Sequence, residues 1–324
     1  MDRRQFSALL IGSGFAGTSL AKTNWKLATG YSAQSFHTVN LMAMALDVAA
    51  ATRGELQIDI HPNNTLVKLG DMRAAVESGG LQAGETIMTS LVGEMPIAGA
   101  DAVPFIVRSY DDARRMWRHQ RPLVERQFEK RGLRVLYAVP WPPQGLYSTK
   151  PITSAFDLRG SRMRTYNSTT ERIATLVGAE PVDVPMVGVG QALAEGRIDS
   201  MITSAVTGVE NKVWSHVKYY YEINAWFPKN IVFANLAALN ALDPGLRDAL
   251  LRASAAAEVR GWAASEAAAS MSVEQLRRNG MQIERSPREF AAEIRRLGER
   301  FSLEWIRQVG AEANEIFVPY FTQA

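Results

Sequence analysis

Residues 243–280 read DPGLRDALLRASAAAEVRGWAASEAAASMSVEQLRRNG, and this stretch decides the fold. Asp243 and Pro244 form a strong helix start, because Asp caps a first turn and proline fits the first helical position. The chain after Pro244 is rich in Ala, Leu, Glu and Arg, and it contains no further proline before Gly280, a residue typical of the position after a helix end. We therefore expect one helix of about 35 residues and roughly 50 Å, which is long enough to cross two lobes.

Upstream of this helix, strand-like and helix-like segments alternate. Runs of apolar residues, some alternating with polar ones, mark the expected strands, and amphipathic spacing that ends at glycine marks the expected helices. Repeated βαβ units of this kind imply an α/β architecture with a mostly parallel sheet covered by helices. The expected strands are 25–29, 56–61, 85–89, 133–139, 163–166 and 199–203, and the expected helices are 39–52, 71–78, 169–177 and 189–195.

The composition limits the function classes. The chain has 324 residues, 47% apolar and 21% charged, and this length suits two lobes of about 120–150 residues each. There is no cysteine, and the four histidines stand far apart, so we expect neither a metal nor a cofactor. The net charge is only +3 and the basic residues are scattered, which does not indicate a nucleic-acid partner. The densest basic run, 114–121, is read as one face of a surface helix.

The first 21 residues, MDRRQFSALLIGSGFAGTSLA, have the plan of an export signal: paired arginines, a short apolar run and small residues. Arg-Arg-Gln-Phe also resembles a twin-arginine signal, so that route and the general one both stay open. Gly12, Gly14 and Gly17 spell G-x-G-x-x-G, which in a dinucleotide-binding fold precedes a crossover helix and an acidic strand end. No acidic residue occurs between Gly17 and Asp47, and strand-like sequence resumes at Trp25. We therefore favour the export signal and expect a periplasmic protein.

Four further segments occur in a specific order along the mature chain. They are Thr29-Gly30-Tyr31 through Ser35-Phe36-His37, Asp157-Leu158-Arg159-Gly160 with Met163-Arg164, Gln191-Ala192-Leu193 with Gly196, Ile198 and Asp199, and Tyr219-Tyr220-Tyr221 through Trp226, Pro228, Lys229, Asn230 and Asn235. Together they resemble the substrate-binding subunits of tripartite ATP-independent periplasmic (TRAP) transporters, the DctP family.

The resemblance implies a type II-like periplasmic binding protein fold, with two α/β lobes and the long C-terminal helix spanning both. With the export signal at 1–21, we expect lobe I at 22–145 with part of the C-terminal region, lobe II at 146–240, and the long helix with further helices packing on both lobes at 241–324. The resemblance also implies a monomer without catalytic activity. Such a protein binds a small organic acid by hinge closure and delivers it to the TRAP membrane subunits.

Arg164 is the first candidate for the binding site, because it falls on the arginine that clamps the ligand carboxylate in the family that the chain resembles. The chemistry agrees, since a guanidinium is always charged and its parallel donors match the two oxygens of a carboxylate. Gln144 falls about where several relatives carry a second arginine. A neutral amide there favours a monocarboxylate with an apolar or aromatic body over a dicarboxylate or a sugar acid.

The remaining candidates come from the same resemblance. Trp141, in the proline-rich loop WPPQGLY, and Met186 supply apolar surface, although either is equally compatible with a core position. Thr203 and Ser204 offer hydroxyl groups to a ligand. Glu85 is the least expected member, because a buried carboxylate needs a partner or a proton. The full set of expected ligand-binding residues is Arg164, Trp141, Gln144, Met186, Thr203, Ser204, Trp226, Phe227, Asn230, Tyr31 and Glu85.

Two other functions share part of this pattern. A binding protein of an ABC importer or a sensor system has the same two-lobe logic but not the four ordered segments. An exported enzyme is compatible with a twin-arginine signal, but no catalytic triad motif, metal spacing or phosphate loop lies outside the signal. We therefore expect a TRAP solute-binding protein rather than an enzyme.

Overall fold

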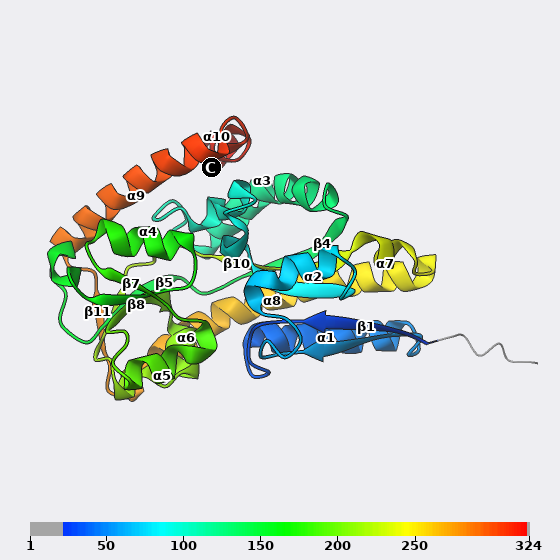
Figure 1. Cartoon of the computed structure of the whole chain (residues 1–324), viewed down its shortest axis with the longest axis horizontal. Helices are drawn as coiled ribbons and strands as arrows, with labels where there is room; N and C mark the ends of the chain where they lie inside the picture. Colours follow the sequence, from blue (N-terminus) through cyan, green and yellow to red (C-terminus); the bar gives the residue numbers. More distant parts are fainter. Residues whose placement is uncertain (1–21, 323–324) are drawn as a thin grey trace, which may run out of the picture.

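The computed structural model describes residues 22–322, and the expected export signal at 1–21 lies outside the described residues. Two β-sheets with helices packed around them form two lobes, and one long helix, α8 (Pro244–Arg278), runs from one lobe to the other (Figure 1). The expected α/β class with two lobes and a long C-terminal helix is confirmed.

The elements follow one another from Thr23 to Thr322. The strands are β1 (Thr23–Ala28), β2 (Leu56–His61), β3 (Ala83–Ile87), β4 (Leu133–Pro140), β5 (Gln144–Ser148), β6 (Arg162–Thr165), β7 (Glu180–Asp183), β8 (Ser200–Ser204), β9 (Tyr219–Glu222), β10 (Lys229–Asn235) and β11 (Gln282–Arg285). The α-helices are α1 (Phe36–Ala51), α2 (Met72–Glu77), α3 (Tyr110–Glu129), α4 (Ser168–Leu176), α5 (Val189–Ala194), α6 (Ala205–Glu210), α7 (Leu236–Asn240), α8 (Pro244–Arg278), α9 (Arg288–Val309) and α10 (Glu312–Thr322). Short 3₁₀ helices are η1 (Leu69–Asp71), η2 (Met88–Leu91), η3 (Pro96–Ala102), η4 (Ala155–Leu158), η5 (Met186–Gly188) and η6 (Val213–Ser215).

The two sheets are mixed rather than mostly parallel. In the first, with strand order β2-β1-β3-β10-β4, β1 pairs in parallel with β2 and β3, whereas β10 is antiparallel to both of its neighbours. In the second, with order β11-β9-β5-β8-β6-β7, β6 pairs in parallel with β7 and β8, and β5 is antiparallel to β8 and β9. The parallel expectation fails at β5 and β10, because these strands enter each sheet directly from the connections between the lobes.

Two connections join the lobes side by side. Residues 141–143 lead from β4 to β5, and residues 223–228 lead back from β9 to β10. Their backbones are bonded to each other: the Trp141 amide donates to the Pro228 carbonyl over 2.7 Å, and the Gln144 amide donates to the Trp226 carbonyl over 3.1 Å. Since β10 lies in the first sheet, the expected end of lobe II at 240 must be corrected. Pairing partners of a strand are non-local, and the sequence pattern does not reveal them.

Helix α8 has the expected bounds, and Asp243 and Pro244 occupy the expected cap and first position. It packs on α1 and β4 in lobe I and on α6 in lobe II. Gly261 allows the closest approach: a Cβ there would lie 2.4 Å from Cγ2 of Val139 and 2.8 Å from Nδ2 of Asn40. A larger residue would force the helix away from the sheet, so this glycine is required by packing.

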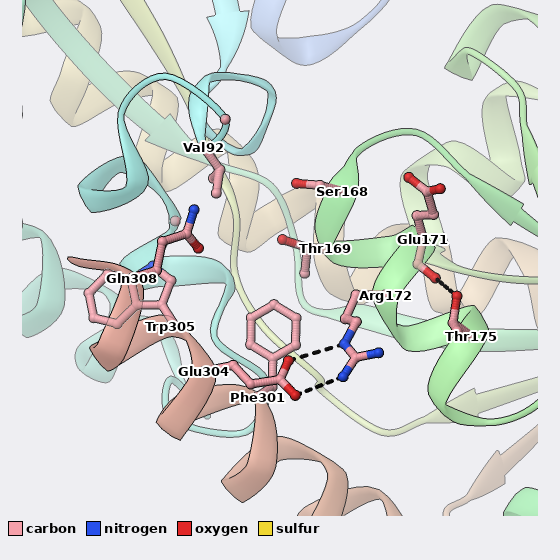
Figure 2. A pocket seen from close by; sticks show the side chains of 12 residues that line it. Val92, Ser168, Thr169, Glu171, Arg172, Thr175, Phe301, Glu304, Trp305 and Gln308 are labelled. Atoms are coloured by element: carbon pink, nitrogen blue, oxygen red, sulfur yellow. Dashed lines mark hydrogen bonds and ion pairs between the residues drawn. The ribbon is translucent and has the colours of Figure 1, made fainter. Parts of the chain in front are cut away.

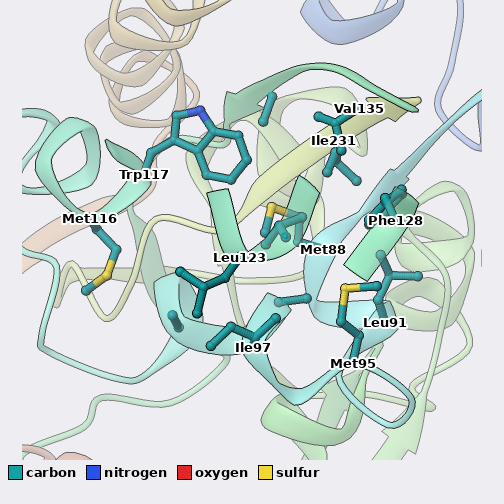
Figure 3. Close-up of a cluster of buried hydrophobic side chains, with 14 of the residues drawn as sticks. Met88, Leu91, Met95, Ile97, Met116, Trp117, Leu123, Phe128, Val135 and Ile231 are labelled. Atoms are coloured by element: carbon teal, nitrogen blue, oxygen red, sulfur yellow. The ribbon is translucent and has the colours of Figure 1, made fainter. Parts of the chain in front are cut away.

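The largest core of lobe I lies between the first sheet, α3 and the η2–η3 region, as Figure 3 shows for Met88, Ile97, Phe128 and other members. The basic run 114–121 lies on α3. Its basic side chains are exposed or half-buried, but Met116 and Trp117 point into this core. The run is therefore the outer face of an amphipathic helix.

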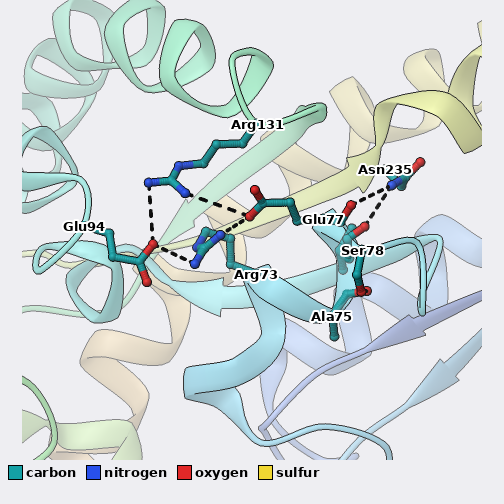
Figure 4. Close-up of polar contacts among 8 residues, drawn as sticks. Arg73, Ala75, Glu77, Ser78, Glu94, Arg131 and Asn235 are labelled. Carbon is teal, nitrogen blue, oxygen red and sulfur yellow. Dashed lines mark hydrogen bonds and ion pairs between the residues drawn. The ribbon is translucent and has the colours of Figure 1, made fainter.

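Away from the connections, surface ion pairs link the elements of lobe I. Figure 4 shows Arg73 of α2 between Glu77 and Glu94, with Arg131 joining the same two carboxylates after α3. Asn235, at the end of β10, donates to the Val76 carbonyl over 2.9 Å. Ion pairs near the surface contribute little to stability individually.

Helix α9, which follows β11, contacts both lobes on the side opposite α8 (Figure 1). Glu293 accepts from the Ala155 amide of lobe II over 2.6 Å, and the Trp305 indole donates to the Pro96 carbonyl of lobe I over 3.0 Å. Within residues 22–322, no helix combines the length and apolar character that crossing a membrane requires.

Candidate ligand-binding site

A cleft of about 630 Å³ lies between the lobes, next to the connections that join them. Lobe I contributes the loop after β1, the loop before η1, the end of β3 and part of η2. Lobe II contributes β6, the segment before and within η5, the end of β8 and α6. The lining residues are Gly30, Tyr31, Asn64, Lys68, Leu69, Gly70, Ile87, Ser90, Trp141, Gln144, Arg164, Tyr166, Asp183, Pro185, Met186, Val187, Thr203, Ser204, Thr207 and Pro228.

Arg164 is a buried cation on the wall of this cleft, with 3% of its surface exposed. Its Nε donates to the Val184 carbonyl over 2.8 Å, and its two terminal nitrogens make no hydrogen bond with any residue in the described range. The Tyr166 ring centroid lies 4.6 Å from its Cζ. Burial lowers the pKa of Arg164 to about 10, so the group stays charged at neutral pH. A fixed, charged fork without a protein anion bound to it suits a carboxylate.

Tyr31 and Trp141 form an aromatic wall in the cleft, with ring centroids 5.1 Å apart and planes tilted by 58°. Both donate to the same side-chain oxygen of Asn230: the Tyr31 hydroxyl over 3.1 Å and the Trp141 indole nitrogen over 2.8 Å. Phe36 and His37 pack against the Trp141 indole at centroid distances of 5.5 and 4.4 Å. We call Tyr31 and Trp141 the aromatic wall below.

Polar groups from lobe II and the first connection line other parts of the cleft. Gln144 is buried; its amide nitrogen donates to the Pro142 carbonyl over 2.8 Å, and its oxygen accepts from the Tyr166 hydroxyl over 3.4 Å. The Thr203 hydroxyl donates to that of Thr207 over 3.1 Å. Ser204 caps α6, accepting from the Thr207 amide. Met186 is half-buried in η5 and lines the cleft as well.

Four residues expected at the site do not line the cleft. Trp226 packs in the core of lobe II, whereas Phe227 packs in the core of lobe I against Tyr110, at a centroid distance of 5.1 Å. Side chains alternate along this extended connection, so neighbouring residues enter different cores. Asn230 and Glu85 are buried behind the aromatic wall.

Glu85 is a buried carboxylate in that second layer. It accepts from the Thr29 hydroxyl over 2.6 Å, and its Oε1 lies 3.6 Å from Nδ1 of His37. Burial raises the pKa of Glu85 from 4.5 to about 7, and burial also holds the pKa of His37 well below its ordinary value. The carboxyl group therefore takes up a proton near neutral pH, whereas the imidazole stays neutral.

Glu85→Gln is expected to gain stability over the unchanged protein as pH rises. The folded state holds the Glu85 proton up to about pH 7, whereas an unfolded glutamate loses it near pH 4.5. Folding stability from this group is therefore complete below about pH 4.5 and falls as pH rises through 7, by about 3 kcal/mol in total. Urea unfolding of both proteins between pH 5 and 8 measures the difference. His37 adds a pH dependence of opposite sign to the stability of both proteins, so it cancels in their difference. If the difference in unfolding free energy does not change with pH, the prediction is contradicted.

Several cleft residues were not expected from the sequence. Tyr166 follows Arg164 by two positions, and the two-residue period of a strand places both on one face, so this signal was present. Asn64, Lys68 and Ser90 come from loops and a 3₁₀ helix, whose path no periodic pattern predicts. Asp183 ends β7, which no expected element included.

A second hollow of about 450 Å³ lies between α4, α9 and the η2–η3 region (Figure 2). Arg172 of α4 donates two hydrogen bonds to the Glu304 carboxylate of α9 across this hollow, and both side chains are half-exposed. None of the expected site residues lines it. The lobes also meet through Asn167, which donates to the Thr89 hydroxyl over 2.7 Å.

Comparison with known proteins gives the family. The sequence model described as "Bacterial extracellular solute-binding protein, family 7" (DctP) matches residues 28–306. The crystal structure of DctP6 of Bordetella pertussis, an extracytoplasmic solute receptor binding pyroglutamic acid, is 36% identical, covers 93% of this chain and 100% of its own, and has a TM-score of 0.91.

Two further relatives agree. A marine metagenome TRAP solute-binding protein specific for pyroglutamate is 35% identical over 93% of this chain and 99% of its own, with a TM-score of 0.90. A solute-binding protein of Albidiferax ferrireducens is 24% identical over 220 residues, and this match spans 64% of each chain. The chain belongs to family 7 of the bacterial extracellular solute-binding proteins, the DctP family of TRAP transporter receptors.

Proposed function

We propose that this protein binds a small monocarboxylate of the pyroglutamate type in the cleft between its lobes. Arg164 carries the proposal, because it is a buried, charged guanidinium on the cleft wall whose terminal nitrogens have no partner within residues 22–322. Two relatives that are 35% and 36% identical bind pyroglutamate. Lys68 and Asp183 also line the cleft but are exposed, so Arg164 is the one buried cation among its lining residues and balances one carboxylate.

The rest of the cleft lining supports a ligand that is a compact ring carrying neutral polar groups. Pyroglutamate is a five-membered lactam that carries one carboxylate, so it presents flat apolar edges, an N–H donor and a C=O acceptor. Tyr31 and Trp141 offer aromatic surface, while Gln144, Thr203 and Ser204 offer uncharged donors and acceptors. The absence of a second arginine at 144 argues against a dicarboxylate or a sugar acid.

Binding proceeds by hinge closure in this proposal. Arg164 lies on lobe II and Tyr31 on lobe I, so a ligand gains both contacts only when the lobes meet, and it shifts the population toward the closed form. The backbone bonds between the two connections, such as Trp141 to Pro228, let them bend as one unit. We further propose a periplasmic monomer that delivers its ligand to the membrane subunits of a TRAP transporter.

A thermal-shift screen tests the proposal. The purified protein is unfolded and refolded to release any co-purified acid, and is then heated with a panel of aliphatic, hydroxy, aromatic, sugar, dicarboxylic and lactam acids. At a ligand concentration a hundred times Kd, the stabilisation of about 2.7 kcal/mol raises Tm by roughly 4 °C for a chain of this length. Shifts only with sugar acids or dicarboxylates contradict the proposed ligand class, and no shift with any acid contradicts carboxylate binding.

Trp141→Ala is expected to weaken the binding of ring-shaped acids more than that of short aliphatic acids. The indole lies on the cleft wall, and only a ring covers enough of it to lose substantial apolar contact, about 25 cal/mol per Å² of buried surface. Titration calorimetry with pyroglutamate, benzoate and propionate measures the three affinities. Equal losses for all three acids contradict a role of Trp141 in selectivity.

A further inference from the structure

One buried amide holds both members of the aromatic wall. Asn230 is 1% exposed and does not line the cleft, yet its Oδ1 accepts from the Tyr31 hydroxyl over 3.1 Å and from the Trp141 indole over 2.8 Å. A carbonyl oxygen has two lone pairs, and here both are directed to ligand-facing side chains. Asn230 therefore lies one layer behind the surface that a ligand would touch.

The three residues come from separate parts of the chain. Tyr31 follows β1, Trp141 begins the first connection between the lobes, and Asn230 is the second residue of β10, just after the other connection. The backbone of Trp141 is fixed by β4, which it directly follows, and by its amide bond to the Pro228 carbonyl. The bond to Asn230 orients the side chain itself.

Packing assigns the Trp141 side chain to lobe I. Phe36 and His37 of α1 pack against the indole, and the Tyr31 ring centroid lies 5.1 Å from the indole centroid. Val206 is the buried member of this cluster that comes from lobe II. An opening of the cleft would thus move the lobe II members of this cluster away and leave the contacts of Trp141 with lobe I in place.

We infer that Asn230 is a positioning residue that fixes the aromatic wall to lobe I and thereby sets selectivity for ring-shaped acids. The inference rests on the proposed function for its ligand class. The aromatic wall is then already formed in the open protein. The ring of the ligand binds to lobe I first, and Arg164 contacts the carboxylate when lobe II closes. Preorganisation of this kind raises affinity because the side chains lose little freedom on binding.

The variant Asn230→Leu has a similar size but no acceptor, and it tests the inference in two ways. In ¹⁵N–¹H spectra the Trp141 indole resonance, assigned with Trp141→Phe, is expected to move upfield with and without ligand as its hydrogen bond is lost. Affinity for pyroglutamate is expected to fall by about tenfold or more, against less than about threefold for propionate. Asn240→Leu, an amide replacement on the exposed end of α7, should change neither.

A double-mutant cycle separates positioning from direct contact. Tyr31→Phe removes only the hydroxyl, so in the Asn230→Leu background it should cost no further affinity. An unchanged indole resonance overturns the inference, as does a uniform loss for all acids or additive losses in the cycle. If the unchanged protein binds no acid in the panel, the proposed function fails, and the indole resonance still decides whether Asn230 holds Trp141.

Discussion

Arg164→Ala is expected to lower the affinity for pyroglutamate between about tenfold and a hundredfold. Hydrogen bonds to a charged group contribute about 1.5–3 kcal/mol, and each 1.4 kcal/mol is a factor of ten. The loss is expected near the top of this range, because Arg164 is 3% exposed and its guanidinium is already fixed by its bond to the Val184 carbonyl, so little conformational freedom is lost when a ligand binds. Isothermal titration calorimetry on the refolded protein measures the effect.

Arg162→Ala is the matched control for this variant. Arg162 lies two positions earlier on β6, is 47% exposed at its side chain and pairs with Asp199 at the surface. Its removal should leave ligand affinity unchanged. Arg164→Lys, which keeps the charge but loses the planar fork, should lie between the two. If Arg164→Ala binds pyroglutamate as tightly as the unchanged protein, the carboxylate clamp is assigned to the wrong residue.

The sequence predicted best those parts of the fold that local signals determine. Helix α8 has the expected bounds, because Asp243, Pro244 and Gly280 mark its ends and no proline interrupts it. Strand β2 also has its expected bounds, since apolar and polar residues alternate along it. The strands β5 and β10 were not expected, because their pairing with distant strands, rather than their own pattern, makes them part of the sheets. Because β10 pairs with β3 and β4, it belongs to lobe I and not to lobe II as expected.

Part of the cleft lining was predictable where one residue type carries the chemistry. Arg164, Trp141 and Gln144, which the family resemblance suggested, line the cleft, and their role in ligand binding stays a prediction. Trp226 and Phe227 do not, because a motif places a segment near the cleft but does not say which side of an extended chain faces it. Asn230 shows the same limit in another form: its segment was expected at the site, but its position behind Tyr31 and Trp141 depends on three distant parts of the chain meeting.

A buried ion pair fixes the end of the second connection, residues 223–228, to lobe I. Lys229, the first residue of β10, and Asp101 of η3 both have fully buried side chains, and the Lys229 Nζ lies 3.0 Å from the Asp101 carboxylate. The same oxygen accepts from the Lys229 backbone amide over 2.9 Å. Burial raises the pKa of Asp101 and lowers that of Lys229, and the charge of each partner opposes this effect on the other.

Lys229→Met is therefore expected to destabilise the fold by about 3–5 kcal/mol, because it leaves the Asp101 carboxylate buried without its partner. Thermal unfolding should show a fall in Tm of roughly 5–8 °C for a chain of this length. The double variant Lys229→Met with Asp101→Asn should recover most of this loss, since a neutral amide oxygen still accepts from the backbone of residue 229 and no charge remains buried. A double variant no more stable than Lys229→Met alone contradicts this account, because the loss would then come from packing around the lysine stem rather than from the stranded charge.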